Sequence, residues 1–212
     1  MSIDPDVGET DQPYTFVGDD PLNAEDALGL KSTGISAKQM SLLRHDVAIA
    51  LSASARHAPD AGALTSNAEV LARRDAAGMS SGPLHLSSQQ KSDGLIIEAM
   101  ALNAGIPQKD VIQLVTASYN ESHLQTADVN QQSGACGLFQ LNDSKNQTAA
   151  ANEGGCADPI ANTAQVVTDY ANYIRVNPNA PPGSAGAAVE RSGEPASYYA
   201  QNLGNLESTF GR

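Results

Sequence analysis

The stretch ASYNESHLQTADVNQQSGACGLFQLN, residues 117–142, joins the end of a predicted helix to a long polar loop. Glu121 stands near the end of that helix, and the segment GACGLFQ, residues 134–140, follows in the loop. The helix dipole disfavours a carboxylate at a helix C-terminus, and partial burial would disfavour its charged form further. Both effects predict a raised pKa for Glu121, the property that a general acid needs at neutral pH. A fraying surface glutamate is the alternative.

The sequence before this loop predicts two helices. The first is expected over the segment SDGLIIEAMALNAG and ends at Gly105. Pro107 opens the second, which has Asp110 in its first turn. An apolar stripe follows at helical spacing: Val111, Leu114, Val115 and Ser118. We therefore expect a mainly α-helical domain over residues 91–212, with helices separated by one long loop.

The N-terminal part has a different composition. The first 28 residues hold eight acidic residues and no basic one, which predicts a flexible acidic arm over 1–34. A small helical region is expected over 35–75, with the capping-box pattern SAKQ at 36–39 and a second short helix over about 66–74. Residues 76–90, rich in Gly, Ser and Pro, predict a linker.

Composition and charge exclude several classes of function. The 212-residue chain has no Trp, so its core must depend on Leu, Ile, Val and Ala. A net charge of −12 argues against nucleic-acid binding and against adhesion to anionic membranes, but leaves a neutral glycan as a ligand. No segment has the roughly 18 apolar residues of a membrane span, so no membrane insertion is expected. The N-terminus lacks the pattern of a secretory signal peptide, so we expect the protein either to stay inside the cell or to cross a membrane by other means.

The two cysteines, Cys136 and Cys156, leave two alternatives open. A disulfide between them would close the loop that follows Glu121 and would stabilise the fold by about 3 kcal/mol. Alternatively, they are two unrelated buried thiols. Two cysteines are too few for a four-ligand zinc site, and no phosphate-binding glycine loop is present, so we expect no metal and no cofactor.

Four matches in the right order resemble the lysozyme-like superfamily of goose-type lysozymes and soluble lytic transglycosylases, in an actinobacterial or actinophage form. They are the pair Glu121-Ser122, the segment GACGLFQ with Phe139 at the usual Met position, DPIANTAQ with Asn162, and AAVERSGEPASYY. In DPIANTAQ, Asp158 and Pro159 also predict a helix start. The resemblance covers residues 93–204 and implies a lysozyme-like helical domain with a long active-site loop.

The resemblance implies roles for individual residues. Glu121 is the general acid that protonates the leaving oxygen of a β-1,4 glycosidic bond. Gln140 offers a donor and an acceptor to the sugar, and Phe139 forms an apolar wall beside the acid. Other candidate substrate-binding residues are Ser122, Ser133, Gly137, Asn162, Tyr198 and Tyr199. In the plainer interpretation the glycines form only a turn and Gln140 lies on the surface; His123 is expected on the surface or in the groove.

Two departures from the family pattern leave the reaction open. Hydrolysis needs a second carboxylate, for which Asp128 and Asp143 are the candidates, because Asn142 stands where goose-type lysozymes carry an aspartate. Lytic transglycosylases need no second acid, but they orient the Glu with a Tyr-Asn pair. This chain has Val189-Glu190 in that region, so Tyr198 or Tyr199 is expected to replace the contact.

The expected function is cleavage of peptidoglycan strands between N-acetylmuramic acid and N-acetylglucosamine. A bacteriophage origin is expected, either as an endolysin released from the host cytoplasm through a holin or as a virion component whose N-terminal region binds other tail proteins. Two other classes remain open: a structural virion protein that keeps a lysozyme-like fold without catalysis, and a glycan-binding module.

Overall fold

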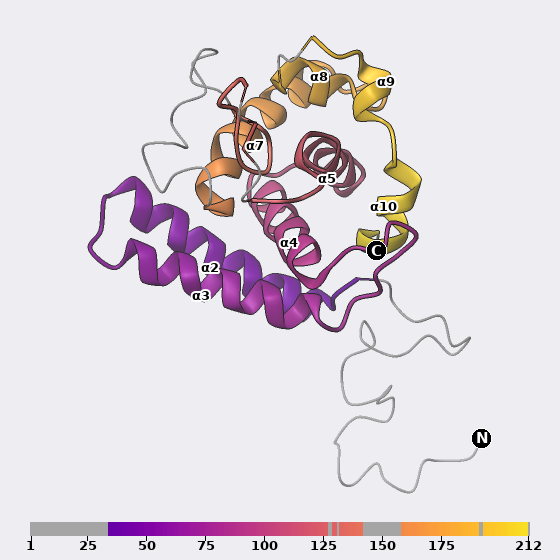
Figure 1. Cartoon of the computed structure of the whole chain (residues 1–212). Helices are drawn as coiled ribbons and strands as arrows, with labels where there is room; N and C mark the ends of the chain where they lie inside the picture. The colour runs from indigo at the N-terminus through magenta and orange to yellow at the C-terminus, as the bar shows by residue number, and fades with distance from the viewer. Residues whose placement is uncertain (1–33, 127–128, 131, 142–157, 191–192, 212) are drawn as a thin grey trace, which may run out of the picture.

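A computed structural model describes residues 34–126, 129–130, 132–141, 158–190 and 193–211 of the protein (Figure 1). Within these residues the chain is mainly helical, which confirms the expected fold class at that level, and it forms isolated β-bridges but no β-strand. Nearly all of the expected acidic arm lies outside the described residues. Among the described helices, none combines the length and apolar character required to span a membrane.

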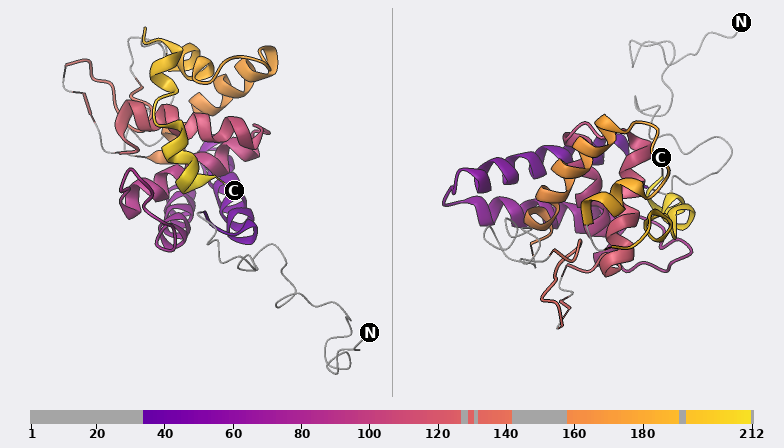
Figure 2. Two further views of the ribbon diagram at one scale, coloured as in Figure 1. Left: turned by 90° about the vertical axis from the view of Figure 1, so that its right-hand side faces the viewer. Right: turned by 90° about the horizontal axis from the view of Figure 1, so that it is seen from above.

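The first two described helices form an antiparallel pair. They are α2 (Ala37–Ala55) and α3 (Ala61–Ala76), which run side by side in both figures (Figures 1 and 2). The capping box at Ser36 is present as predicted. However, α3 begins about five residues earlier than expected, because packing against α2 extends it over Gly62 and Thr65, whose own helix preference is weak.

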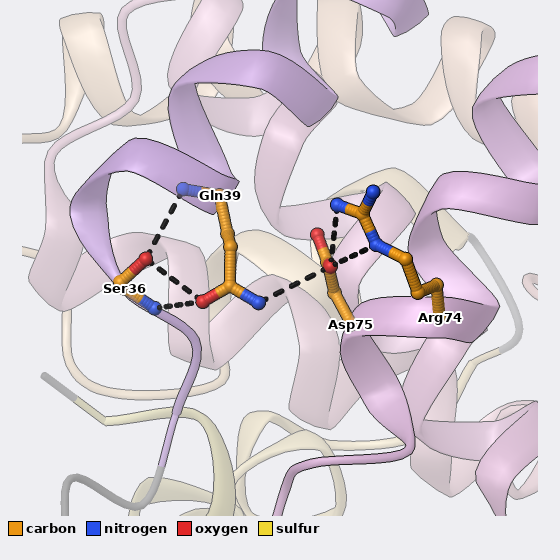
Figure 3. A network of polar contacts seen from close by, with 4 residues as sticks. All are labelled: Ser36, Gln39, Arg74 and Asp75. Carbon is orange, nitrogen blue, oxygen red and sulfur yellow. Dashed lines mark hydrogen bonds and ion pairs between the residues drawn. The ribbon is translucent and has the colours of Figure 1, made fainter.

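A polar network ties the start of α2 to the end of α3 (Figure 3). Gln39, which completes the capping box with Ser36, also donates its amide N–H to the Oδ1 atom of Asp75 over 3.2 Å. The Arg74 guanidinium donates to the same oxygen from Nε and Nη2, at 3.0 and 2.9 Å. Asp75 is buried while Arg74 reaches solvent, so the buried carboxylate has a positive partner.

Helix α4 (Ser88–Asn103) lies in the middle of the molecule and is buried on all sides from residue 91 to 101. It contacts α2, α3, α5 and α7 (Pro159–Val176). At Gly94 the ring of Phe210 approaches so closely that an added Cβ would lie 2.3 Å from its Cζ atom. The segment expected as a linker, 76–90, carries buried Met79 and Leu86 and ends in the first turn of α4.

Helix α5 (Gln108–Ser122) appears nearly end-on at the centre of Figure 1. Gly105 and Pro107 stand before it in the predicted places, with φ +77° at the glycine. Around it lie α4, α8 (Ser184–Glu190), α9 (Ala196–Tyr199) and α10 (Leu203–Phe210), all of which contact it. The α2–α3 pair lies on the opposite side of the molecule from α8 and α9 (Figure 2).

Candidate functional site

Glu121 is the next-to-last residue of α5, and it is half-buried. The helix ends at Ser122 because His123 and then Leu124 take up the left-handed conformation, with φ of 56° and 57°. The structure therefore confirms the prediction that this carboxylate lies at the C-terminal end of a helix.

The Glu121 carboxylate accepts a hydrogen bond from a buried tyrosine. Its Oε1 atom accepts a hydrogen bond of 2.6 Å from the hydroxyl of Tyr199, which lies at the end of α9. Tyr199 is almost fully buried. Its ring packs on Gly186 of α8, where an added Cβ would lie 3.0 Å from the tyrosine Cγ atom. The glycine therefore allows α8 to press directly against the residue that holds Glu121.

The neighbouring residues hold the same two segments together. The Tyr198 hydroxyl donates to the backbone carbonyl of Asn120, and the Asn120 amide donates to the carbonyls of Tyr198 and Gln201, at 2.9 and 3.2 Å. The Asn202 amide donates to Asn120 Oδ1 over 3.2 Å. Asn120, the residue before Glu121, is thus bonded to Tyr198, Gln201 and Asn202, which stand on either side of Tyr199 in the sequence.

Tyr198 itself is partly exposed beside this carboxylate. Its ring meets that of Tyr199 edge to face, with centroids 5.1 Å apart. Burial raises the pKa of Tyr198, and the negative charges of Glu121 and Glu194 raise it further. A second carboxylate, Glu194, therefore acts on the same tyrosine as Glu121.

The GACGLFQ segment forms a tight turn. Cys136 and Leu141 exchange backbone hydrogen bonds of 3.1 and 3.0 Å as an antiparallel bridge, and Cys136 pairs with Val129 in a second bridge. Gly137 has φ +76°, the conformation that favours glycine, but Gln140 has φ +45° without being a glycine. Gln140 is half-buried, and both its backbone N–H and its side-chain amide donate to the Gly137 carbonyl.

Buried polar side chains fix this turn to the helices. The hydroxyls of Ser118 and Ser122 both donate to the Leu138 carbonyl over 2.9 Å. Asn162 of α7 accepts from the Phe139 N–H over 3.0 Å and donates to the Cys136 carbonyl over 3.2 Å. The turn is thus attached to α5, which carries Glu121, and to α7.

This burial corrects the expected roles of several residues. The resemblance implies that Ser122, Phe139 and Asn162 contact the substrate, but all three have no exposed surface. Ser122 and Asn162 hold the turn, and Phe139 belongs to the core. Tyr199, which is also buried, orients Glu121. Gln140 and Tyr198 keep exposed surface with which to contact a ligand.

The remaining candidates are more peripheral or lie outside the described residues. Ser133 is exposed, and its hydroxyl accepts a local bond from the Ala135 N–H. His123 is exposed, as expected, and meets the Tyr119 ring edge to face. Cys136 is disulfide-bonded. Asp128, Asp143 and Cys156 lie outside the described residues.

Two cavities lie at the other end of α5. Their volumes are about 440 and 240 Å³, and Lys109 and Asp110 line both. Glu121 lies 12 residues further along the helix, or about 18 Å at the α-helical rise, and lines neither cavity. Among the described residues, no three His, Cys, Asp or Glu side chains are grouped so that they could hold a metal ion.

Sequence reasoning missed Ser118, Asn120, Gly186 and Glu194. The contacts of Ser118 and Asn120 span 20 or more positions. The contact of Gly186 with Tyr199 and the effect of Glu194 on Tyr198 depend on how the chain folds around α9, and no local motif marks them. No known family model matches the chain, and no curated protein or solved structure is significantly similar to it. A function must therefore be inferred from the residues around Glu121.

Proposed function

We propose that the protein is a peptidoglycan-cleaving glycosidase with a lysozyme-like helical domain, and that Glu121 is its general acid. The observation that carries the proposal is the 2.6 Å hydrogen bond from Tyr199 to Glu121. A reactive carboxyl group must be held in one orientation to meet the leaving oxygen, and this buried hydroxyl fixes one of its two oxygens.

The surroundings of Glu121 suit a sugar substrate. The C-terminal end of α5 and the Cys136–Leu141 turn are joined through Ser118 and Ser122, so the acid and the Gln140 amide are carried by one connected unit. Gln140 can donate to and accept from an N-acetyl group or a hydroxyl. Tyr198 is partly exposed and lies near Glu121, so we propose that its ring contacts the sugar.

The tyrosine contact favours lytic transglycosylation over hydrolysis. In that reaction the substrate's own 6-hydroxyl attacks the anomeric carbon, and Glu121 acts first as acid and then as base to give a 1,6-anhydro product. The reaction needs an oriented glutamate but no second carboxylate, and Tyr199 supplies the orienting contact that the sequence lacks at Val189-Glu190. We further propose a bacteriophage role, in lysis or in wall penetration.

The test is mass spectrometry of the fragments released from purified peptidoglycan by the wild type and by Glu121→Gln. We expect anhydro-muramic ends from the wild type and none from the mutant, with unchanged circular dichroism. Reducing ends would instead indicate a muramidase. Activity equal to wild type in Glu121→Gln would end the assignment of the general acid.

A negative result with wild-type protein would also be informative. If a folded wild type releases no fragments from several walls, including actinobacterial ones, the proposal of catalysis fails. Co-sedimentation with insoluble peptidoglycan would then indicate a glycan-binding module. Co-purification as a multimer or with phage tail proteins would indicate a structural virion protein.

A further inference from the structure

Another carboxylate, that of Asp93 on α4, is buried near the segment that follows α5. It has no exposed surface, and both of its oxygens accept hydrogen bonds of 2.8 Å. Gln89, one turn earlier on α4, donates its amide to Oδ1, and the hydroxyl of Thr126 donates to Oδ2. Thr126 follows Glu121 by five residues, so this contact joins α4 directly to the chain that leaves the candidate site.

The segment between Glu121 and Thr126 needs such a contact. His123 and Leu124 are both left-handed, a conformation that costs a non-glycine residue about 1–2 kcal/mol. Gln90 of α4 donates its amide to the His123 carbonyl over 2.8 Å, and Leu124 is fully buried. The first two turns of α4 therefore hold this segment at its beginning, through Gln90, and at its end, through Asp93.

We propose that Asp93 is a positioning residue for Glu121: through Thr126 it fixes the path of residues 122–126 and thereby the end of α5. Its link to catalysis rests on the proposed function, but its link to the segment does not. Asp93 has no exposed surface through which to reach a substrate, so its effect must pass through Thr126.

The ionisation of Asp93 should control how firmly the segment is held. Burial raises the pKa of Asp93 to about 6, although the hydrogen bonds from Thr126 and Gln89 lower it. Burial therefore affects the pKa of Asp93 more than the two hydrogen bonds do. The charged groups that act on Asp93 are Glu69, which raises its pKa, and Arg73, which lowers it; both lie on α3 and form an ion pair of 2.7 Å.

The sign of the pH dependence follows from this shift. When residues 122–126 detach from α4, which we call the open state, water reaches the Asp93 carboxyl group and its pKa returns toward the ordinary value of 3.8. The closed state, with the segment attached, therefore binds the proton more tightly than the open state. Protonated Asp93 thus favours the closed segment, and that preference is lost as the pH rises from about 4 to above 6. Because burial raises the pKa of Asp93 from 3.8 to about 6, opening should become up to about 100-fold more frequent over this range.

The experiment is amide hydrogen exchange of the full-length protein at several pH values, with each rate divided by its intrinsic rate. The probes are the amides of His123 and Gln125, which donate to the carbonyls of Tyr119 and Ser122. In the wild type we expect protection to fall as the pH rises from about 4 to about 6 and then to level off, and in Asp93→Asn we expect no such dependence. Thr126→Val should lower protection, and Thr126→Ser, which keeps the hydroxyl, should restore it.

Activity on peptidoglycan separates positioning from a purely structural role. Thr126→Val should lower kcat about tenfold with little change in KM, because it misplaces the acid but leaves the sugar contacts, and Thr126→Ser should recover it. Equal protection in Thr126→Val and wild type would overturn the contact, even if the wild type cleaves no wall. Lower protection with unchanged kcat in an active enzyme would overturn the positioning role.

Discussion

The α2–α3 pair and the Glu121 end of α5 satisfy their polar groups in opposite ways. At the start of α2, Ser36 and Gln39 cap the helix from only three positions apart. At the end of α5, Tyr199 reaches Glu121 from 78 positions away, and Asn202 reaches Asn120 from 82 positions away. One helix end is therefore set by its local sequence, and the other by the assembly of the whole domain.

The difference explains why the unusual backbone conformations near the candidate site can persist. His123, Leu124 and Gln140 are left-handed without being glycine, and this backbone conformation is unfavourable for each of them. Contacts from α4, α7 and α9 hold the segments around them. A site built this way is fixed only when the fold is complete, so its geometry should be more sensitive to distant substitutions than the α2–α3 pair.

The largest effect on stability is expected from Asn162→Ala. The substitution leaves the buried N–H of Phe139 without its partner, at about 1–3 kcal/mol. It also removes one of the two hydrogen bonds to the Cys136 carbonyl, which keeps the bond from the Leu141 N–H, at about 1 kcal/mol. We expect the free energy of unfolding, from urea denaturation, to fall by about 2–4 kcal/mol in total. Asn172→Ala, at an exposed position of the same helix, is the control and should change it by less than about 0.5 kcal/mol. Equal effects would mean that Asn162 does not hold the turn.

Tyr199→Phe should affect activity more than stability. It removes the hydroxyl that fixes Glu121 while keeping the ring against Gly186. Loss of this contact misplaces the acid, and a misplacement of about 1 Å can slow a reaction about 100-fold, so kcat for wall cleavage should fall about 10- to 100-fold. Tyr198→Phe, which removes a bond to the Asn120 backbone, is the matched control with the smaller expected loss. If the control loses more activity, Tyr199 is not the orienting residue.

Features with local causes could be predicted from the sequence. The capping box at Ser36, the helix boundary at Gly105 and Pro107, and the cap at Asp158 each depend on residues within a few positions, and all are present. The position of Glu121 at a helix end follows from the same local pattern. These predictions needed no knowledge of which helices pack together.

Features with distant causes could not be predicted in the same way. The sequence offers Tyr198 and Tyr199 as equivalent candidates, and only the packing of α9 on α8 selects Tyr199 to contact Glu121. Asn162 and Phe139 stand in segments that resemble the lysozyme-like pattern, but a resemblance does not tell whether a side chain points to a ligand or into the core. The early start of α3 and the Asp93–Thr126 contact likewise depend on how helices pack.

Ser36→Ala tests the local side of the comparison. It removes the hydroxyl that accepts from the Gln39 N–H, and the loss of an N-cap costs about 1 kcal/mol. Thermal unfolding should show this loss, whereas Ser41→Ala, at an exposed position within α2, should be neutral or slightly stabilising. Activity on peptidoglycan should remain at the wild-type level in both variants. A loss of activity in Ser36→Ala alone would show that the α2–α3 pair also controls the candidate site.

The smallest effect on stability is expected from Gln140→Gly. Glycine relieves a left-handed conformation that costs about 1–2 kcal/mol, but it adds backbone entropy to the unfolded chain, worth about 0.5–1 kcal/mol. It also loses the side-chain bond to the Gly137 carbonyl, which contributes about 1 kcal/mol, so these terms nearly cancel.

Gln140→Ala is the matched variant, because it loses the same amide but keeps the unfavourable φ. It should be about 1 kcal/mol less stable than Gln140→Gly in urea denaturation. If the Gln140 amide contacts the glycan, both variants should lose wall-cleaving activity to the same extent despite their different stabilities. Activity that instead follows stability would mean that Gln140 only shapes the turn, and that the sugar is bound by other residues near Glu121.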